Sequence, residues 1–232
     1  VRKMNIFITS TNTDVGKTYV TVNLYHFLKN EGYNVTIFKP FQTEEMPDGT
    51  YPDLEMYKNE CGLSYETTSL YKFKDPISPH LAFKREPHQI FDRQVIIDRA
   101  EELAARHDIV LIEGAGGIAV PIHNSGKEWY MTADLIKDIG ADHIISVVPS
   151  KLGAIGDIVV HQRFLESKNL PSNTLIMNRY SNTDVEQDNL LTVKDLLHQN
   201  VETFPENGTA SEIPKSILNH LKGVKNDESS KA

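Results

Sequence analysis

Apolar residues along this chain fall into two kinds of stretch. Short runs rich in β-branched and aromatic residues, bounded by turn residues, are typical of buried strands. Longer stretches in which apolar residues recur every three or four positions predict helices that bury one face. The predicted strands cover residues 6–8, 35–38, 109–112, 143–148, 174–177 and 201–204. The predicted helices cover residues 18–31, 53–61, 92–106, 132–139, 154–167, 185–198 and 214–221.

Strands and helices alternate along most of the chain, which predicts an α/β fold with an open, mostly parallel central sheet and helices on both of its faces. We expect one domain over residues 1–232, in which residues 1–3 are a leader ahead of Met4 and residues 222–232 form a flexible tail. In such sheets ligands bind beyond the carboxyl ends of the strands, so polar residues at those ends are the candidates for function.

Two stretches carry more detailed expectations. Residues 63–85 follow neither periodicity and are expected to be irregular. The helix at residues 92–106 is amphipathic, and one face should pack on the sheet. The residues expected on that buried face are Val95, Ile96, Ala100 and Leu103.

The first predicted strand leads into a polar loop that closes on Gly16-Lys17-Thr18. A strand, loop, Gly-Lys-Thr and helix in this order form a phosphate site, because the loop amides and the helix N-terminus face the anion. In such a site Lys17 reaches the outer phosphates and the Thr18 hydroxyl ligates Mg²⁺. The common spacing of the motif would need a glycine where this chain has Thr11. The position of the triplet between a strand and a helix is therefore a stronger signal than its letters, and it indicates a P-loop NTPase fold.

Charged residues follow two further predicted strands. Lys39 comes directly after the second strand, and Glu113 ends the apolar run at residues 109–112. At the same edge of the sheet, Lys39 would project into the cleft beside Lys17, and two ammonium groups there need an anion such as a phosphate or a carbamate between them. Glu113 would take the position of a magnesium-binding carboxylate at a strand end. These placements predict phosphoryl-transfer chemistry.

Asp53 allows two interpretations of equal weight. As the residue before a predicted helix, it is a typical N-cap whose carboxylate accepts backbone hydrogen bonds. As a carboxylate near the phosphate loop, it is also a suitable second ligand for Mg²⁺, which prefers hard oxygen donors. The residues alone leave both interpretations open.

Composition narrows the class of protein. The formal net charge of −8 argues against a nucleic-acid-binding surface as the main function. Cys61 is the single cysteine, so no intrachain disulfide can form, which fits a reducing compartment. The N-terminus has no apolar signal core, and no apolar run approaches the length of a membrane span. We therefore expect a cytoplasmic protein with no membrane partner.

Five segments match one family in chain order. They read STNTDVGKT, KPFQT, PISPH, EGAGG and KLGAI at residues 10–18, 39–43, 76–80, 113–117 and 151–155. They resemble motifs of the dethiobiotin synthetases, whose nucleotide loop is one residue longer than the common one. The resemblance extends from Asn5 to about Pro205.

The resemblance implies a role for each matching position. Lys39 and Lys17 are the catalytic residues it implies, and Mg²⁺ would be held by Thr18, Asp53 and Glu113. The nucleotide-binding positions it implies are Asp14, Val15, Gly16, Lys17, Thr18, Tyr19, Asp53, Glu113, Gly114, Ala115, Gly116, Asn178, Arg179, Pro205, Glu206 and Asn207. The substrate-binding positions it implies are Thr11, Lys39, Thr43, Ser78, Pro79, Gly117, Leu152 and Gly153.

The resemblance also implies a reaction and its partners. In dethiobiotin synthetases 7,8-diaminononanoate, CO₂ and ATP give dethiobiotin, ADP and phosphate through a carbamate and a carbamic-phosphoric anhydride, with Mg²⁺ as cofactor. The family is homodimeric and binds its substrate near the subunit interface. This chain departs from the family at Gly156-Asp157, where Asn-His is usual, and at Arg179, where aspartate is usual. The first departure leaves only backbone amides at position 156 to contact the tail of the substrate.

One alternative from another class is a nucleotide-switch protein of the partitioning or nitrogenase iron-protein type, which has a related fold. Those proteins carry an extra lysine near the start of the glycine-rich loop. The corresponding stretch here is Ser10-Thr11-Asn12-Thr13, which contains no lysine. The synthetase is therefore the favoured hypothesis.

Overall fold

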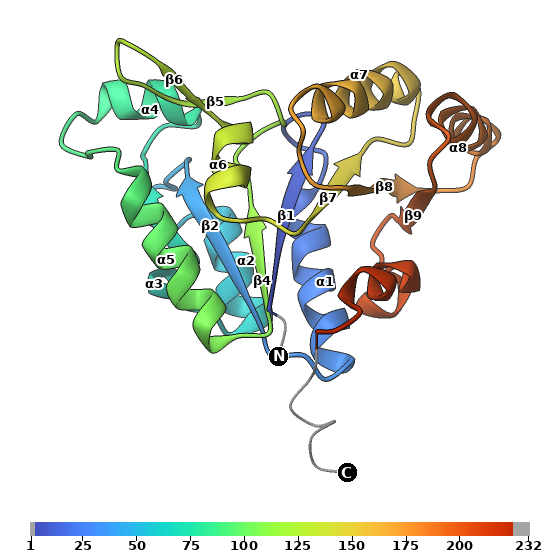
Figure 1. Ribbon diagram of the computed structural model, residues 1–232, viewed down its shortest axis with the longest axis horizontal. Coiled ribbons are helices and arrows are strands. Elements are labelled where there is room, and N and C mark those ends of the chain that lie inside the picture. The colour runs from blue at the N-terminus through green and yellow to red at the C-terminus, as the bar shows by residue number, and fades with distance from the viewer. Residues whose placement is uncertain (1–2, 225–232) are drawn as a thin grey trace.

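The computed structural model describes residues 3–224, which form a seven-stranded sheet with helices on both faces (Figure 1). Its strand order is β3-β2-β4-β1-β7-β8-β9, and every neighbouring pair is parallel. The strands are β1 Met4–Ser10, β2 Val35–Gln42, β3 Ser69–Lys72, β4 Ile109–Glu113, β7 His143–Val148, β8 Asn173–Tyr180 and β9 Val201–Pro205. The predicted fold class is confirmed. The expectations for the leader and the tail concern residues that lie mostly outside the described range.

The helices follow the predicted alternation closely. The longer ones are α1 Lys17–Asn30, α2 Pro52–Cys61, α5 Arg93–Arg106, α7 Ala154–Ser167 and α8 Asp184–Leu197. The shorter ones are α3 Tyr65–Thr68, α4 Pro79–Arg85 and α6 Thr132–Asp138, with 3-10 helices η1 Ala210–Glu212 and η2 Lys215–Leu221. No helix within residues 3–224 has both the length and the apolar character to cross a membrane.

The central strand β1 shows how the sheet separates two cores. Ile6 and Ile8 pack on the face covered by α1 and α2, whereas Phe7 packs on the face covered by α5 and α6. Successive side chains of a strand point to opposite faces, so a strand buried on both sides must be apolar throughout. This is why β1 and β4 appear in the sequence as unbroken apolar runs.

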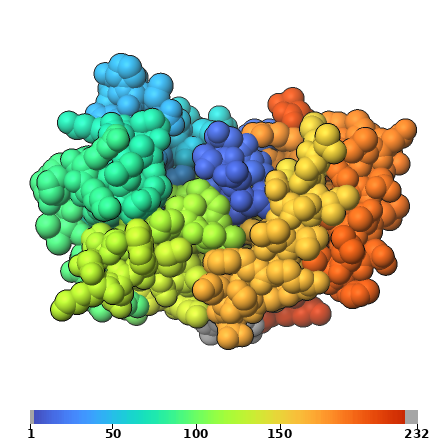
Figure 2. All heavy atoms as spheres, turned by 90° about the horizontal axis from the view of Figure 1, so that it is seen from above, coloured from blue at the N-terminus to red at the C-terminus, as the bar shows by residue number. Residues whose placement is uncertain are grey.

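Strand register places the functional strand ends side by side. Ile8 of β1 pairs with Glu113 of β4, and Phe38 of β2 pairs with Ile112 of the same strand. The residues after Ile8, Phe38 and Ile112 therefore lie at one edge of the sheet. Figure 2 looks onto this edge and shows the blue N-terminal segment between the green and the yellow parts of the chain.

The structure differs from the sequence prediction in several local elements. β2 does not end before Lys39 but continues to Gln42, because beyond Phe38 it pairs with β3, as Lys39 with Ser69 and Phe41 with Tyr71. Residues 63–85 are not irregular throughout, since they contain α3, β3 and α4. These elements are too short to display a periodicity. The same holds for the hairpin β5 Pro121–Asn124 and β6 Trp129–Met131.

Two predictions about helices are also wrong. Val95 is 42% exposed, although Ile96, Ala100 and Leu103 are buried as expected. Spacings of four and three place those three side chains on one helical face, and Val95 points about 100° away from Ile96. The last predicted helix is the 3-10 helix η2 and not an α-helix.

A buried carboxylate fastens the end of β8 to the loop after β7. Glu186, in the first turn of α8, accepts hydrogen bonds from the Ser150 hydroxyl (2.7 Å), the Ser181 N–H (3.0 Å) and the Thr183 hydroxyl (2.8 Å). Burial alone would raise the pKa of Glu186, but these hydrogen bonds outweigh it and lower the pKa to about 2. The ionised carboxylate therefore stabilises the fold next to the carboxyl end of β8.

We expect Glu186→Gln to lower the free energy of unfolding at pH 7 by about 2 kcal/mol, because an amide is a weaker acceptor than a carboxylate. The pKa is lower in the folded state than its ordinary value of 4.5, so this stabilisation is complete above pH 4.5 and is lost as the pH falls towards 2. Urea denaturation should therefore show a smaller difference in the free energy of unfolding between the wild type and Glu186→Gln at pH 4 than at pH 7. Glu166→Gln, an exposed residue paired with Arg163, is the matched control. If Glu186→Gln lowered the free energy of unfolding equally at both pH values, altered packing and not the charge of Glu186 would account for the loss of stability.

Candidate functional site

The loop between β1 and α1 has the backbone geometry of an anion site. Asp14 and Gly16 have φ values of 63° and 100°, both in the left-handed region, and α1 begins directly after Gly16. No side chain caps the N-terminus of this helix. The first amides of a helix lack partners within the helix and attract negative charge, so this end of α1 suits a phosphate.

The end of β8 is fastened to this loop. Asn178 donates from Nδ2 to the Val15 carbonyl (2.8 Å), and Arg179 donates from Nη1 to the Asp14 carbonyl (2.8 Å). The approach is close enough that a Cβ on Gly16 would lie 2.3 Å from Asn178 Nδ2. Only glycine fits this position, on grounds of both φ and space.

Lys17 extends back along the loop and is buried. Its Nζ donates to Ser10 Oγ (3.2 Å). Burial is the main cause that lowers the pKa of Lys17 to about 8, and the charge of Lys39 adds to it, while Glu113 opposes it. An anion bound next to this ammonium would favour its charged form.

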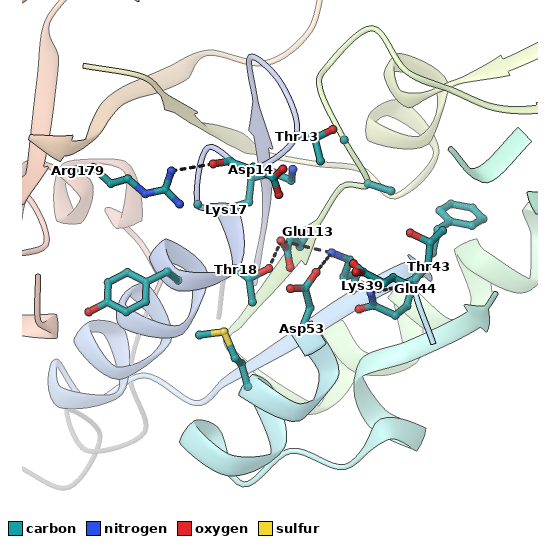
Figure 3. Close-up of a pocket in the computed structure, with 17 residues that line it drawn as sticks. Thr13, Asp14, Lys17, Thr18, Lys39, Thr43, Glu44, Asp53, Glu113 and Arg179 are labelled. Atoms are coloured by element: carbon teal, nitrogen blue, oxygen red, sulfur yellow. Dashed lines mark hydrogen bonds and ion pairs between the residues drawn. The ribbon is translucent and has the colours of Figure 1, made fainter. Parts of the chain in front are cut away.

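Lys39 lies between two carboxylates at the carboxyl edge of the sheet (Figure 3). Its Nζ is 2.5 Å from Asp53 Oδ2 and 3.6 Å from Glu113 Oε1, and the side chain is buried. Burial would lower the pKa of Lys39, but the charges of Glu113 and Asp53 outweigh it and raise that pKa. The same Glu113 oxygen accepts a hydrogen bond from the Thr18 hydroxyl (2.7 Å). Residues from β2, β4, α1 and α2 thus converge on one point.

The structure resolves the two interpretations of Asp53. The N-cap of α2 is Tyr51, and Pro52 takes the first helical position, which proline favours. Asp53 therefore lies inside the first turn and does not cap the helix. Its carboxylate contacts Lys39 instead, and this charge lowers the pKa of Asp53 although burial alone would raise it.

The donor set formed by Thr18, Asp53 and Glu113 fits a magnesium ion. Glu113 is only 1% exposed, and its Oε2 has no hydrogen-bond partner. A buried carboxylate oxygen without a partner is costly unless a cation binds it. Mg²⁺ typically takes one or two carboxylates, a hydroxyl, phosphate oxygens and water. No cluster of three or more His, Cys, Asp or Glu residues suited to a metal occurs within the described part of the chain. Any magnesium site here would thus need phosphate or water oxygens as well.

These residues line a cavity of about 330 Å³. The expected residues that line it are Asp14, Gly16, Lys17, Thr18, Tyr19, Lys39, Thr43, Asp53, Glu113, Ala115, Gly116 and Arg179. A smaller adjoining pocket of about 150 Å³ is lined by Tyr19, Asn178, Arg179, Pro205, Glu206 and Asn207, all of which the sequence assigned to the nucleotide. The two pockets adjoin at Tyr19 and Arg179, and together they have a size suited to a nucleotide.

Two expected nucleotide residues lie beside the cavity without lining it. Gly114 packs on Phe7, where an added Cβ would lie 2.9 Å from the ring. Val15 packs against the core, and its contribution is the carbonyl that holds Asn178. Both act on the shape of the loop and not through a side chain.

Several expected substrate residues lie apart from the cavity. Gly117 packs against the backbone of Thr11, and a Cβ added at Gly117 would lie 2.9 Å from the Thr11 carbonyl oxygen. Thr11 lines a separate pocket together with Gly156 and Asp157. Ser78 and Pro79 begin α4, and the Ser78 hydroxyl bonds His80 Nδ1 (2.8 Å). Leu152 is 95% exposed and Gly153 is the N-cap of α7. Of the eight residues assigned to the substrate, only Lys39 and Thr43 line the main cavity.

Five further residues that were not expected from the sequence also line the cavity. They are Thr13, Phe41, Gln42, Glu44 and Met56. Most of them are close in sequence to residues that were assigned to the site, and this proximity could have indicated them. Phe41 and Gln42 lie between Lys39 and Thr43, Glu44 follows directly, and Met56 is one helical turn after Asp53.

Comparison with known proteins identifies the family. A family model described as "AAA domain" matches residues 4–214. The ATP-dependent dethiobiotin synthetase BioD of Staphylococcus epidermidis is 56% identical over 96% of this chain and 100% of that protein. The chain belongs to the dethiobiotin synthetase family. A second member, from Geobacillus sp. strain WCH70, is 36% identical over 83% of the chain and 80% of its own length.

Solved structures similar to this synthetase confirm the P-loop fold. The MinD cell division protein of Aquifex aeolicus has a TM-score of 0.54 at 18% identity, covering 97% of this chain and 90% of that one. A ParA family ATPase of Chlorobium tepidum has a TM-score of 0.53 at 12% identity, covering 99% and 93%. At this identity the likeness shows the fold alone. The much higher identity to the synthetases decides against the alternative of a nucleotide switch.

We expect Gly16→Ala to weaken the binding of a fluorescent ATP analogue by at least about tenfold, because a Cβ would strain the left-handed backbone and displace Asn178. Titration followed by fluorescence measures this affinity. Gly156→Ala on α7 is the matched control, because a Cβ there meets no atom within 4 Å. Wild-type affinity in Gly16→Ala would show that the contact between β8 and the loop is not needed for nucleotide binding.

Proposed function

We propose that this dethiobiotin synthetase family member converts 7,8-diaminononanoate, CO₂ and ATP into dethiobiotin, ADP and phosphate, a step of biotin biosynthesis. The observation that carries the proposal is the placement of the buried ammonium of Lys39 beside the phosphate loop, between Asp53 and Glu113. Together with Lys17 it provides two positive charges for one anionic site. The names and the identity of the relatives support the overall reaction.

The proposed chemistry has three steps. One amine of the substrate attacks the carbon of CO₂, forming a carbamate and releasing a proton. A carbamate oxygen then attacks the γ-phosphorus of ATP, the bond to ADP breaks, and a carbamic-phosphoric anhydride forms. The second amine attacks the carbamate carbon, which closes the ureido ring, expels phosphate and releases the proton of that amine. None of these steps needs a covalent enzyme intermediate, so positioning and charge neutralisation are the main tasks of the protein.

Each lysine has a distinct part in this proposal. Lys17 and the amides that begin α1 bind the terminal phosphates and stabilise the charge that develops during phosphoryl transfer. Lys39 approaches from the β2 side and binds the carbamate and the phosphoryl oxygens. Mg²⁺, held by Thr18, Asp53 and Glu113, would neutralise charge on the β- and γ-phosphates. Pro205, Glu206, Asn207 and Asn178 would surround the base of the nucleotide.

We further propose a homodimer located in the cytoplasm. Leu152 and Val160 of the α7 region are 95% and 70% exposed, which is apolar surface that a second copy would remove from water. Leu152 and Gly153 do not line the cavity of their own chain. A second copy could bring them to the substrate of the first, which is the arrangement that the family resemblance implies. Reduced Cys61 fits the proposed location.

The proposed reaction requires that ATP hydrolysis depend on the other substrates. We expect phosphate release to need both diaminononanoate and bicarbonate, and dethiobiotin to form in equal amount. Phosphate release measured with each component omitted in turn tests this, with mass spectrometry for the product. Hydrolysis at an unchanged rate without the diamine or bicarbonate would contradict the proposal and favour a nucleotide switch.

We expect Lys39→Met to lower kcat at least about 100-fold, because it removes a positive charge from the site of phosphoryl transfer. Lys58→Met is the matched control, since Lys58 lies exposed on α2, the helix that also carries Asp53. Steady-state kinetics give kcat, and circular dichroism checks that the variant is folded. A folded variant with normal kcat would remove Lys39 from the catalytic residues.

A further inference from the structure

The main cavity contains a carboxylate to which the reaction steps above give no role. Glu44 lines it from the loop that follows β2. Figure 3 shows Glu44 near Thr43 and Lys39, whereas Asp14 and Arg179 lie across the cavity at the phosphate loop. Glu44 therefore belongs to the side that the substrate would occupy, not to the nucleotide side.

The other carboxylates of the cavity are differently placed. Asp53 and Glu113 contact Lys39, and Glu113 also accepts a hydrogen bond from Thr18. Asp14 is part of the phosphate loop, where its carbonyl holds Arg179. Within residues 3–224 the carboxylate of Glu44 forms no ion pair or side-chain hydrogen bond. Glu44 is exposed, so water solvates its carboxylate, and no neighbouring residue neutralises the negative charge that it presents on the substrate side.

The backbone fixes Glu44 in a conformation that glutamate rarely adopts. Its φ is 71°, in the left-handed region that favours glycine. The Glu44 N–H donates to the Asp75 carbonyl (3.2 Å), and the Glu45 N–H donates to the Lys74 carbonyl (2.9 Å). These bonds involve only backbone atoms, so a glycine could make them without the strain. The glutamate side chain has a conformational cost here that no contact within the protein offsets.

The chemistry of the proposed substrate supplies a partner for this charge. A vicinal diamine carries at least one ammonium group near neutral pH, and Lys17 presents a positive charge to the same cavity, whereas Asp53 and Glu113 already compensate that of Lys39. A carboxylate on the substrate side would attract the ammonium and oppose this repulsion. We propose that Glu44 binds the ammonium group of the diamine substrate and makes the site selective for it. This inference rests on the proposed function.

The test compares Glu44→Gln, Glu44→Gly and Glu45→Gln in steady-state assays with each substrate varied. We expect both Glu44 variants to raise the KM for diaminononanoate about tenfold, the loss typical of a charge-assisted hydrogen bond, and to change the KM for ATP less than twofold. Glu44→Gly should melt at or above the wild-type temperature, because glycine suits the left-handed backbone. Glu45→Gln is the control, since Glu45 accepts a hydrogen bond from Tyr51 and does not line the cavity.

The possible outcomes separate this inference from the proposed function. Absence of dethiobiotin synthesis by the unmodified chain would overturn the proposed function and the role of Glu44 with it. Normal synthesis with an unchanged KM for the diamine in Glu44→Gln would overturn the role of Glu44 alone. A parallel rise in the KM for ATP, or a lower melting temperature in Glu44→Gly, would show a structural role for Glu44 and would also overturn the inference.

Discussion

The buried contact of Lys39 with Asp53 and Glu113 is the interaction on which the arrangement of the site depends. Charges removed from water are strongly destabilised unless opposite charges lie next to them. Here each partner comes from a different element, so the cluster can form only when β2, β4 and α2 take their native positions. Glu113, held in place by this charge compensation, also accepts a hydrogen bond from the Thr18 hydroxyl. The charge cluster therefore also positions the end of the phosphate loop.

The sheet makes this concentration of charge possible. A parallel sheet covered on both faces consists of apolar strands, and polar residues appear only where those strands end. The register of β1, β2 and β4 brings three such ends to one edge. The MinD and ParA proteins share this scaffold at 18% and 12% identity, which shows how little of the sequence the scaffold requires. The side chains at the strand ends, not the fold, distinguish one activity from another.

The sequence predicted the parts of the site that follow from strand ends, and it predicted the rest less well. Lys17, Thr18 and Glu113 were found because each directly follows an apolar run or a glycine turn. Asp53 stayed ambiguous because helix capping and metal binding favour the same residue type, and only the position of Pro52 in the helix separates them. Glu44 was missed although it directly follows Thr43, because its positive φ, which turns the loop after β2 at this residue, is not visible in the sequence. The short elements within residues 63–85 depend on tertiary contacts and show no periodicity of their own.

The attachment of β8 to the phosphate loop has a consequence for biosynthesis. The bonds from Asn178 to Val15 and from Arg179 to Asp14 join residues 163 and 165 positions apart. The neighbours of β1 in the sheet, β4 and β7, are likewise made more than a hundred residues after it. A ribosome therefore synthesises β1 and the phosphate loop long before their partners exist. These segments cannot reach their native contacts until most of the chain has been made. Contacts between residues far apart in sequence slow folding, and the apolar strands stay exposed during translation. Exposed apolar segments of this kind are what chaperones bind.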